Sequence, residues 1–188
     1  MQQLLEYISQ RTFVDRTLEE RIRSDFEWVS LSKGTIILEE DRKANYLYFV
    51  DKGLVHNYYY LEDGRKITSW FYDENHFVTA WSSFFQQKPS FEVIEALEEC
   101  ELYRISYTNY QQLIADFPPF SHFARLLAEE MLSFLDEFAK GWSFLSAKGK
   151  YELILMHFPD IELRVKLGLI SSFLGISQET LSRLRATK

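Results

Sequence analysis

Hydrophobic and polar residues alternate with three successive periods along this chain. Up to about residue 27 the apolar positions follow helical spacing, which predicts one or two short amphipathic helices. From Trp28 to Tyr107 the period falls to two, in segments rich in Ile, Val, Tyr, Phe and Thr that predict short β-strands. After Tyr107 helical spacing returns and continues to about Ala186. The pattern therefore predicts helices, then an antiparallel barrel or sandwich, then a helical C-terminal part.

Glycines mark the turns between the predicted strands. Asp63-Gly64 lies between two aromatic-rich runs and is a strong hairpin signal, because both central residues of the favoured two-residue turn need positive φ. Lys52-Gly53 is a weaker signal of the same kind. We therefore expect a hairpin at each of these two dipeptides.

A long helix is predicted between the strands and the C-terminal segment. A short helix over 109–116 should end before Pro118-Pro119, and the long one should run from about residue 119 to 145. Its apolar positions recur in steps of three and four, which is the spacing of a coiled-coil seam. This stripe could pack only on the chain's own barrel, but a second apolar edge leaves a face for another copy. We expect a homodimer with a seam of Phe120, Leu127, Met131, Phe134 and Phe138.

The C-terminal segment predicts two short helices joined by a tight turn. Helices over 167–174 and 177–186 flank Gly175, which tolerates a left-handed backbone, and Ser177 stands at the N-cap of the second helix. This arrangement is typical of a helix-turn-helix, although a helical hairpin with an ordinary polar face has the same spacing. Lys166, ahead of the first helix, would hold a phosphate. The exposed face of the second helix would carry Gln178, Glu179, Ser182, Arg183 and Arg185, whose side chains suit base edges and phosphates.

Charge is unevenly distributed over the 188 residues. From Lys140 onward eight Lys and Arg face four Asp and Glu, a net charge of +4, whereas the first 139 residues hold 13 against 24, a net charge of −11. A basic tail on an acidic body favours contact between the tail and a polyanion, although such a tail is also common on a solvated surface.

Composition excludes several classes of protein. Cys100 is the only cysteine, so a disulfide framework, a cysteine-ligated zinc site and a cysteine-ligated iron–sulfur cluster are ruled out. The N-terminus lacks the apolar run of a signal peptide, and no stretch of eighteen apolar residues predicts a membrane helix. We expect a soluble cytoplasmic protein without a membrane partner.

The order of these segments, with LGISQETLSRLR near the C-terminus, resembles the Crp/Fnr family of bacterial transcription regulators over essentially the whole chain. The resemblance implies an α+β fold: an antiparallel β-roll (a double-stranded β-helix of cyclic-nucleotide-binding type) with flanking helices over 1–117, a dimerisation helix over 118–145 and a helix-turn-helix over 146–188. It implies a homodimer on double-stranded DNA with an inverted repeat, and RNA polymerase as a further partner. By position, Glu179, Ser182 and Arg183 match the family's base-reading residues, and Gln178 and Lys166 match positions of base-edge or phosphate contacts.

The sequence departs from the relatives that bind cyclic AMP. Those relatives carry Gly-Glu and Arg-Ser or Arg-Thr, where this chain has Thr79-Ala80 and Ser90-Phe91. Lys88 could replace the missing arginine, but Glu92 and Glu95 oppose it. The corresponding effector pocket would comprise Thr79, Trp81, Ser82, Ser83, Lys88 and Ser90. We expect no tight binding of cyclic AMP and no cofactor, with the effector unknown.

A second departure concerns the β-hairpin wing that many relatives carry after the second helix. After Arg185 this sequence has only Ala-Thr-Lys, so phosphate contacts would come from Lys148, Lys150, Lys166 and Lys188. We expect weaker binding that falls less steeply with salt.

Two alternatives remain. In the first, the pocket of the roll is packed core and DNA binding is constitutive. The aromatic residues of the roll fit either such a filled core or an apolar effector site; these residues are Tyr58, Tyr59, Tyr60, Trp70, Phe71 and Trp81. The second is a metalloenzyme on a cupin-like barrel, which needs paired histidines. The four histidines, His56, His76, His122 and His157, have no such spacing, so we expect neither a metal site nor an enzyme.

Overall fold

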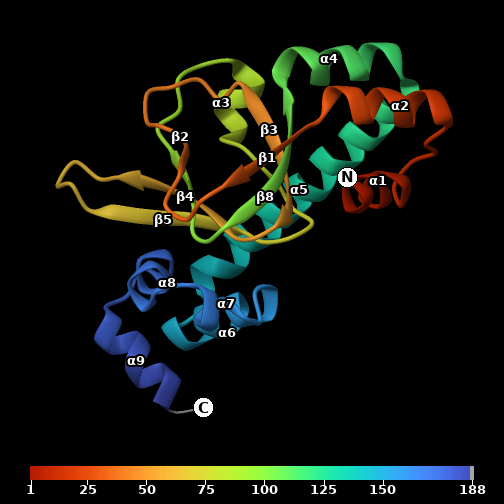
Figure 1. Ribbon diagram of the computed structural model, residues 1–188. Helices are drawn as coiled ribbons and strands as arrows, with labels where there is room; N and C mark the ends of the chain where they lie inside the picture. Colours follow the sequence, from red (N-terminus) through yellow and green to blue (C-terminus); the bar gives the residue numbers. More distant parts are fainter. Residues whose placement is uncertain (187–188) are drawn as a thin grey trace.

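The computed structural model describes residues 1–186 and places a β-roll between two groups of helices (Figure 1). The helices are α1 (Gln2–Ser9), α2 (Arg16–Asp25), α3 (Trp81–Gln86), α4 (Tyr107–Asp116), α5 (Pro118–Phe144), α6 (Ala147–His157), α7 (Ile161–Arg164), α8 (Leu167–Leu174) and α9 (Gln178–Ala186). The strands are β1 (Glu27–Leu31), β2 (Ile36–Leu38), β3 (Tyr46–Lys52), β4 (Val55–Tyr60), β5 (Lys66–Tyr72), β6 (Phe77–Val78), β7 (Val93–Ala96) and β8 (Cys100–Ser106). Within this range no helix is long and apolar enough to cross a membrane.

The N-terminal periodicity forms two helices. On α1 the buried residues are Leu4, Leu5 and Ile8, at the spacing of one helix face. The side chain of Asp15 accepts a 2.8 Å hydrogen bond from the Leu18 N–H and so caps α2. Both helices pack against the roll, in agreement with the expected flanking helices.

The eight strands form two four-stranded antiparallel sheets with strand orders β1-β8-β3-β6 and β2-β7-β4-β5. The main hydrophobic core lies between the sheets and extends to α1, α2, α4 and the first half of α5. Its largest fully buried side chains include Phe49, Phe84, Phe120 and Phe123. The antiparallel strands expected from the period-two segments, and the β-roll that the resemblance implies, are confirmed.

The two glycine turns differ from each other. Asp63-Gly64 connects β4 and β5 as a hairpin, but the loop spans residues 61–65, and Gly64 has a φ of 80° whereas Asp63 does not have a positive φ. The hairpin expected at Lys52-Gly53 is wrong, because β3 and β4 belong to different sheets and the chain crosses between them there. A Cβ on Gly53 would lie 2.6 Å from Cys100 Sγ, so close approach to β8 and a φ of 103° both require glycine.

The C-terminal helices share a second core with the roll. Leu54, Phe71 and Leu97 of the roll pack in it against residues of α6 to α9. Trp70 on β5 makes edge-to-face contacts with Phe134 and Phe138 of α5 at centroid distances of 5.2 and 4.9 Å. This second core crosses the expected boundaries after residues 117 and 145, and the division into three domains stays a prediction.

Candidate nucleic-acid interface and sensor cavity

Helices α8 and α9, which we call the terminal helix pair, are joined by a turn whose geometry follows from two residues. Gly175 ends α8 with a φ of 67°, and the Ile176 N–H then bonds to the Ser171 carbonyl at 3.1 Å. The hydroxyl of Ser177 accepts a 3.1 Å hydrogen bond from the Thr180 N–H, so Ser177 is the N-cap of α9 as predicted. The turn thus provides hydrogen-bond partners for backbone groups at the end of α8 and at the start of α9.

One face of α9 is buried and the other is open. Leu181 is fully buried against Ile170 and Leu174 of α8 and thereby fixes which face of α9 points outward. The seven residues of the predicted DNA-binding set are all exposed, namely Lys166, Ser177, Gln178, Glu179, Ser182, Arg183 and Arg185. Figure 1 shows α8 between the roll and α9, so the roll does not cover this face. Lys188, a predicted phosphate contact, lies outside the described residues.

Besides Ser177, three members of this set form ion pairs with residues of α7 or α9. Arg183 lies 3.7 Å from Glu179 one turn earlier on α9. Arg185 forms a 2.6 Å ion pair with Glu162 of α7, and Glu162 also accepts a 2.6 Å hydrogen bond from the Tyr151 hydroxyl. Arg185 therefore anchors the end of α9 to α6 and α7, a role that the sequence did not predict.

Two polar side chains, those of Ser172 and Arg164, attach this region to the roll. Ser172 of α8 accepts a hydrogen bond from the Thr68 N–H on β5 at 3.1 Å and donates one to the Lys66 carbonyl at 3.0 Å. Arg164 of α7 donates two hydrogen bonds to Glu74, at 2.9 and 3.0 Å, and also pairs with Glu98. Neither Ser172 nor Arg164 was predicted, since nothing in the local sequence indicates a partner about 70 to 100 residues away.

The carboxylate of Glu74 is stabilised in its charged form by this contact. Burial alone would raise the pKa of Glu74, but hydrogen bonds from Arg164 and from the Gly53 N–H hold that pKa below its ordinary value. Arg164 is correspondingly held in its charged state. The attachment between α7 and the roll is therefore a full ion pair at neutral pH.

The residues of the predicted effector pocket do not line a common space. Thr79 donates to the Tyr46 carbonyl at 2.9 Å, and Ser83 accepts from the Ala44 N–H at 2.9 Å and donates to the Lys88 carbonyl. Ser90 bonds to the backbone of Glu92 two residues on. Ser82 and Lys88 are exposed, and Trp81 faces a different hollow beside α5. Thr79, Ser83 and Ser90 are therefore hydrogen-bonded to the backbone of the chain, and Trp81 lines a separate hollow.

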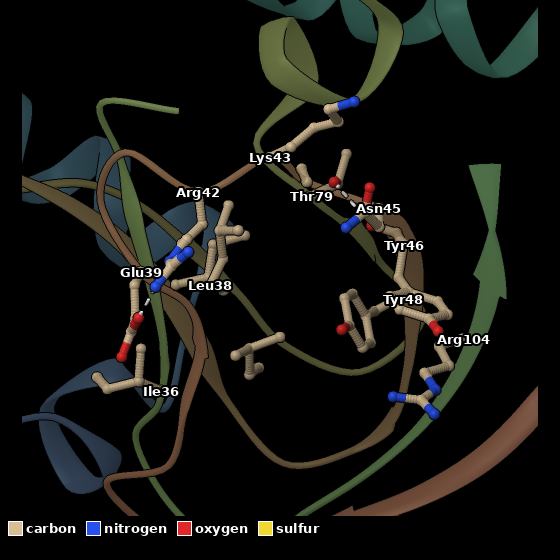
Figure 2. Close-up of a pocket in the computed structure, with 13 residues that line it drawn as sticks. Ile36, Leu38, Glu39, Arg42, Lys43, Asn45, Tyr46, Tyr48, Thr79 and Arg104 are labelled. Carbon is tan, nitrogen blue, oxygen red and sulfur yellow. Dashed lines mark hydrogen bonds and ion pairs between the residues drawn. The ribbon is translucent and has the colours of Figure 1, made fainter. Parts of the chain in front are cut away.

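The roll nevertheless encloses an open cavity of about 360 Å³ between β2, β3, β7 and β8 (Figure 2). Of the predicted pocket residues, only Thr79 lines it. Figure 2 shows Leu38 and Tyr48 directed into the cavity from opposite sides, with Arg42 near one rim and Arg104 near the other. The signal that could have indicated Arg104 is its position in β8, where period two places it on the same sheet face as Tyr48.

The aromatic residues considered as a filling for the roll do not line its cavity. Trp70 and Phe71 pack against Phe158 and Phe173 of the C-terminal helices, at centroid distances of 5.4 to 6.2 Å. Tyr58 and Tyr60 contact each other edge to face. These aromatic side chains serve packing, but they are not among the residues that line the cavity.

The predicted seam on α5 divides into two groups. Phe120 and Leu127 are buried in the chain's own core, and Phe134 and Phe138 contact Trp70, so these four side chains already have partners within the chain. Met131 is half-buried. With Leu127 it lines an apolar groove that also includes Trp81, Phe85, Leu132 and Leu135, and Leu132 is 69% exposed. The open apolar edge of α5 therefore combines Met131 of the predicted seam with Leu132 and Leu135 beside it.

The histidines lie apart from one another. His56 is buried beside Glu95, His76 pairs with Asp73, and His122 and His157 lie on α5 and α6. Within residues 1–186, no group of three or more His, Cys, Asp or Glu side chains is placed to hold a metal ion.

Comparison with known proteins shows which proteins this chain is similar to. Residues 28–117 match the family model of the cyclic nucleotide-binding domain. The cAMP-activated global transcriptional regulator CRP of Pasteurella multocida is 26% identical over 163 residues, which cover 81% of this chain and 78% of that protein.

Solved structures agree with the observed fold. The c-di-GMP responsive global regulator CLP of Xanthomonas campestris superposes with a TM-score of 0.68 at 20% identity, over 92% of this chain and 91% of that one. FixK2 from Bradyrhizobium japonicum gives a TM-score of 0.74 at 18% identity, over 86% and 83%. The β-roll, the long helix that follows it and these matches together support a regulator of the Crp/Fnr family.

Proposed function

We propose that this protein is a dimeric, sequence-specific DNA-binding regulator in which α9 is the recognition helix. The observation that carries the proposal is the two-faced character of α9. Leu181 is fully buried while Glu179, Ser182 and Arg183 are exposed together on the opposite side. A helix held in this way can enter a major groove, where arginine pairs with guanine and glutamate accepts a hydrogen bond from cytosine.

Phosphate contacts would surround this helix. Lys166 precedes α8 and is exposed, and Lys148 on α6 is also exposed. These cations lie in the part of the chain whose net charge is positive, whereas the roll carries the negative charge. Such a distribution directs the terminal helix pair, rather than the roll, toward DNA.

The dimer would form through the apolar groove of α5 and its neighbours. A second copy is the occupant best suited to it, because the same long helix presents Leu132 and Leu135 on an exposed edge in each chain. Two symmetry-related recognition helices would then contact half-sites about one helical turn apart, roughly 34 Å, within an inverted repeat. RNA polymerase as a partner and the cytoplasm as the site of action stay predictions.

Tight binding of cyclic AMP is not expected. Ser90 occupies the position where cyclic-AMP-binding relatives are expected to have arginine, and its hydroxyl is bound to its own loop. Glu92 nearby accepts a 2.8 Å hydrogen bond from Ser69, so this part of the roll holds a carboxyl group rather than a guanidinium. An anionic phosphate there would lack its strongest partner.

The proposal is tested by selecting bound duplexes from a random DNA pool with the purified full chain. We expect an enriched inverted repeat with a C·G pair in each half-site. A pool that stays unenriched, under salt conditions in which nonspecific DNA binding is detectable, would remove the claim of sequence-specific recognition.

A further inference from the structure

The cavity in the roll has a charged rim and a wall that is partly apolar. Arg42, Lys43 and Arg104 lie along it, and among the described residues that line it Glu39 is the one carboxylate. Glu39 pairs loosely with Arg42 at 3.7 Å, and both side chains are largely exposed. The lining also includes Leu38 and Ile94, which present hydrocarbon to the same space.

Arg104 is the cation that the fold positions most firmly. It is the cross-strand partner of Tyr48, and its guanidinium lies 4.4 Å from the centroid of the Tyr46 ring. Its Nε and Nη2 atoms contact one oxygen of Glu27 at 2.9 and 2.8 Å. Glu27 is 61% exposed in its side chain, so this pair is open to water and exchangeable.

The size and charge of the cavity restrict its ligand. A volume of about 360 Å³ lies in the range of small-molecule sites. The three cations face two carboxylates, Glu39 and Glu27, which leaves a surplus of about one positive charge for a singly charged ligand. Ile36, Leu38 and Ile94 on the lining offer hydrocarbon surface to an apolar ligand body.

We propose that this cavity binds a small organic carboxylate with an apolar body, whose carboxylate pairs with Arg104 while the body packs against Leu38, Ile94 and Tyr48. The planar guanidinium matches a carboxylate in geometry, and the wall replaces water around the hydrocarbon. The site differs from the pocket expected from the sequence, because Lys88 and Ser90 do not line it. The proposal rests on the proposed regulator function only in assigning this ligand the role of effector.

The test is calorimetric titration of the full chain, without DNA, with phenylacetate and octanoate. The matched neutral probes are phenylacetamide and octanamide, and cyclic AMP is a further ligand. Three variants accompany the wild type. Arg104→Gln removes the guanidinium, Glu27→Gln removes its competing carboxylate, and Arg65→Gln is the control, since Arg65 lies in the β4–β5 loop outside the cavity.

We expect at least one carboxylate to bind about tenfold or more tightly than its amide, the effect of one charge-assisted contact. Arg104→Gln should remove this difference, whereas Glu27→Gln should strengthen carboxylate binding several-fold and Arg65→Gln should leave it unchanged. Because the two substitutions should change carboxylate affinity in opposite directions, a general loss of folding cannot explain both results. The melting temperature of each variant checks its folding as well.

Three results would overturn the proposal: neither carboxylate binds, amide and acid bind equally, or Arg104→Gln binds as the wild type does. Tighter binding of cyclic AMP than of both carboxylates would overturn the ligand class. Since no DNA is present, failure here leaves DNA recognition standing, and an unenriched DNA pool would leave the ligand site standing.

Discussion

The hydroxyl of Ser172 on α8 accepts a 3.1 Å hydrogen bond from the backbone N–H of Thr68 on β5. The strand β5 is an edge strand, and its pairing with β4 is interrupted by a register shift between Asn57 and Tyr58. A free edge N–H normally needs water or another strand, and here a helix of the C-terminal region supplies the partner. The Ser172 side chain thus joins the terminal helix pair to the backbone of the roll.

Removing this hydroxyl should weaken the attachment. Ser172→Ala leaves the Thr68 N–H and the Lys66 carbonyl without their partner, so we expect the free energy of unfolding to fall by about 1–2 kcal/mol. Urea denaturation measures this change. Ser133→Ala, at an exposed position of α5, should change the free energy by less than about 0.5 kcal/mol. Equal effects of the two substitutions would show that the bond to β5 contributes nothing.

Acid should destabilise the fold partly through His56. This side chain is fully buried, and burial, together with the nearby Lys66, lowers the pKa of His56 to about 4. The unfolded chain therefore binds a proton at His56 at a higher pH than the folded chain does, so stability is lost as the pH falls from about 6.5 to about 4. The contribution is on the order of 3 kcal/mol over that range.

The variant His56→Phe keeps an aromatic ring beside Phe71 and removes the titrating group. We expect its free energy of unfolding, measured in urea at a series of pH values, to fall less steeply between pH 6.5 and 4 than that of the wild type. Parallel profiles for the two proteins would mean that His56 does not remain neutral in the folded state.

The dimer should depend on the exposed edge of α5. Leu132→Glu places a charge in the apolar groove, and we expect the dissociation constant of the dimer to rise at least about tenfold because that charge would have to lose its water. Sedimentation equilibrium measures the constant. Ser133→Glu adds the same charge beside the groove as a control. A dimer that persists in Leu132→Glu with the wild-type constant would place the interface elsewhere.

Local signals sufficed for the helical parts of the chain. The N-cap at Ser177 and the left-handed turn at Gly175 depend on residues within a few positions, so the ends of α8 and α9 were predictable. The long helix was placed correctly to within one residue at each end because Pro118 opens it and its apolar spacing continues to its end. Helix α7 was missed, since four residues are too few for a periodic signal.

Features that depend on distant pairing were not predictable. Lys52-Gly53 has the composition of a hairpin, and only the pairing of β3 with β8 makes it a crossing between sheets. The spacing of three and four residues on α5 identifies its apolar positions. It does not show whether they pack against Trp70 of the same chain or against a second copy. The cavity likewise combines Leu38, Tyr48 and Arg104 from separate strands. The resemblance instead indicated the segment around Ser90, whose hydroxyl is hydrogen-bonded to its own loop.

The measurement that tests the central claim most directly is binding of wild type, Arg183→Ala and Lys166→Ala to the selected duplex and to its single-base-pair variants at fixed salt. We predict that Arg183→Ala costs about 1–3 kcal/mol on the selected duplex and abolishes discrimination at one base pair of each half-site. Lys166→Ala should weaken binding to all duplexes alike. If Arg183→Ala discriminates among the duplexes as the wild type does, Arg183 does not read a base and its assigned role on α9 is contradicted.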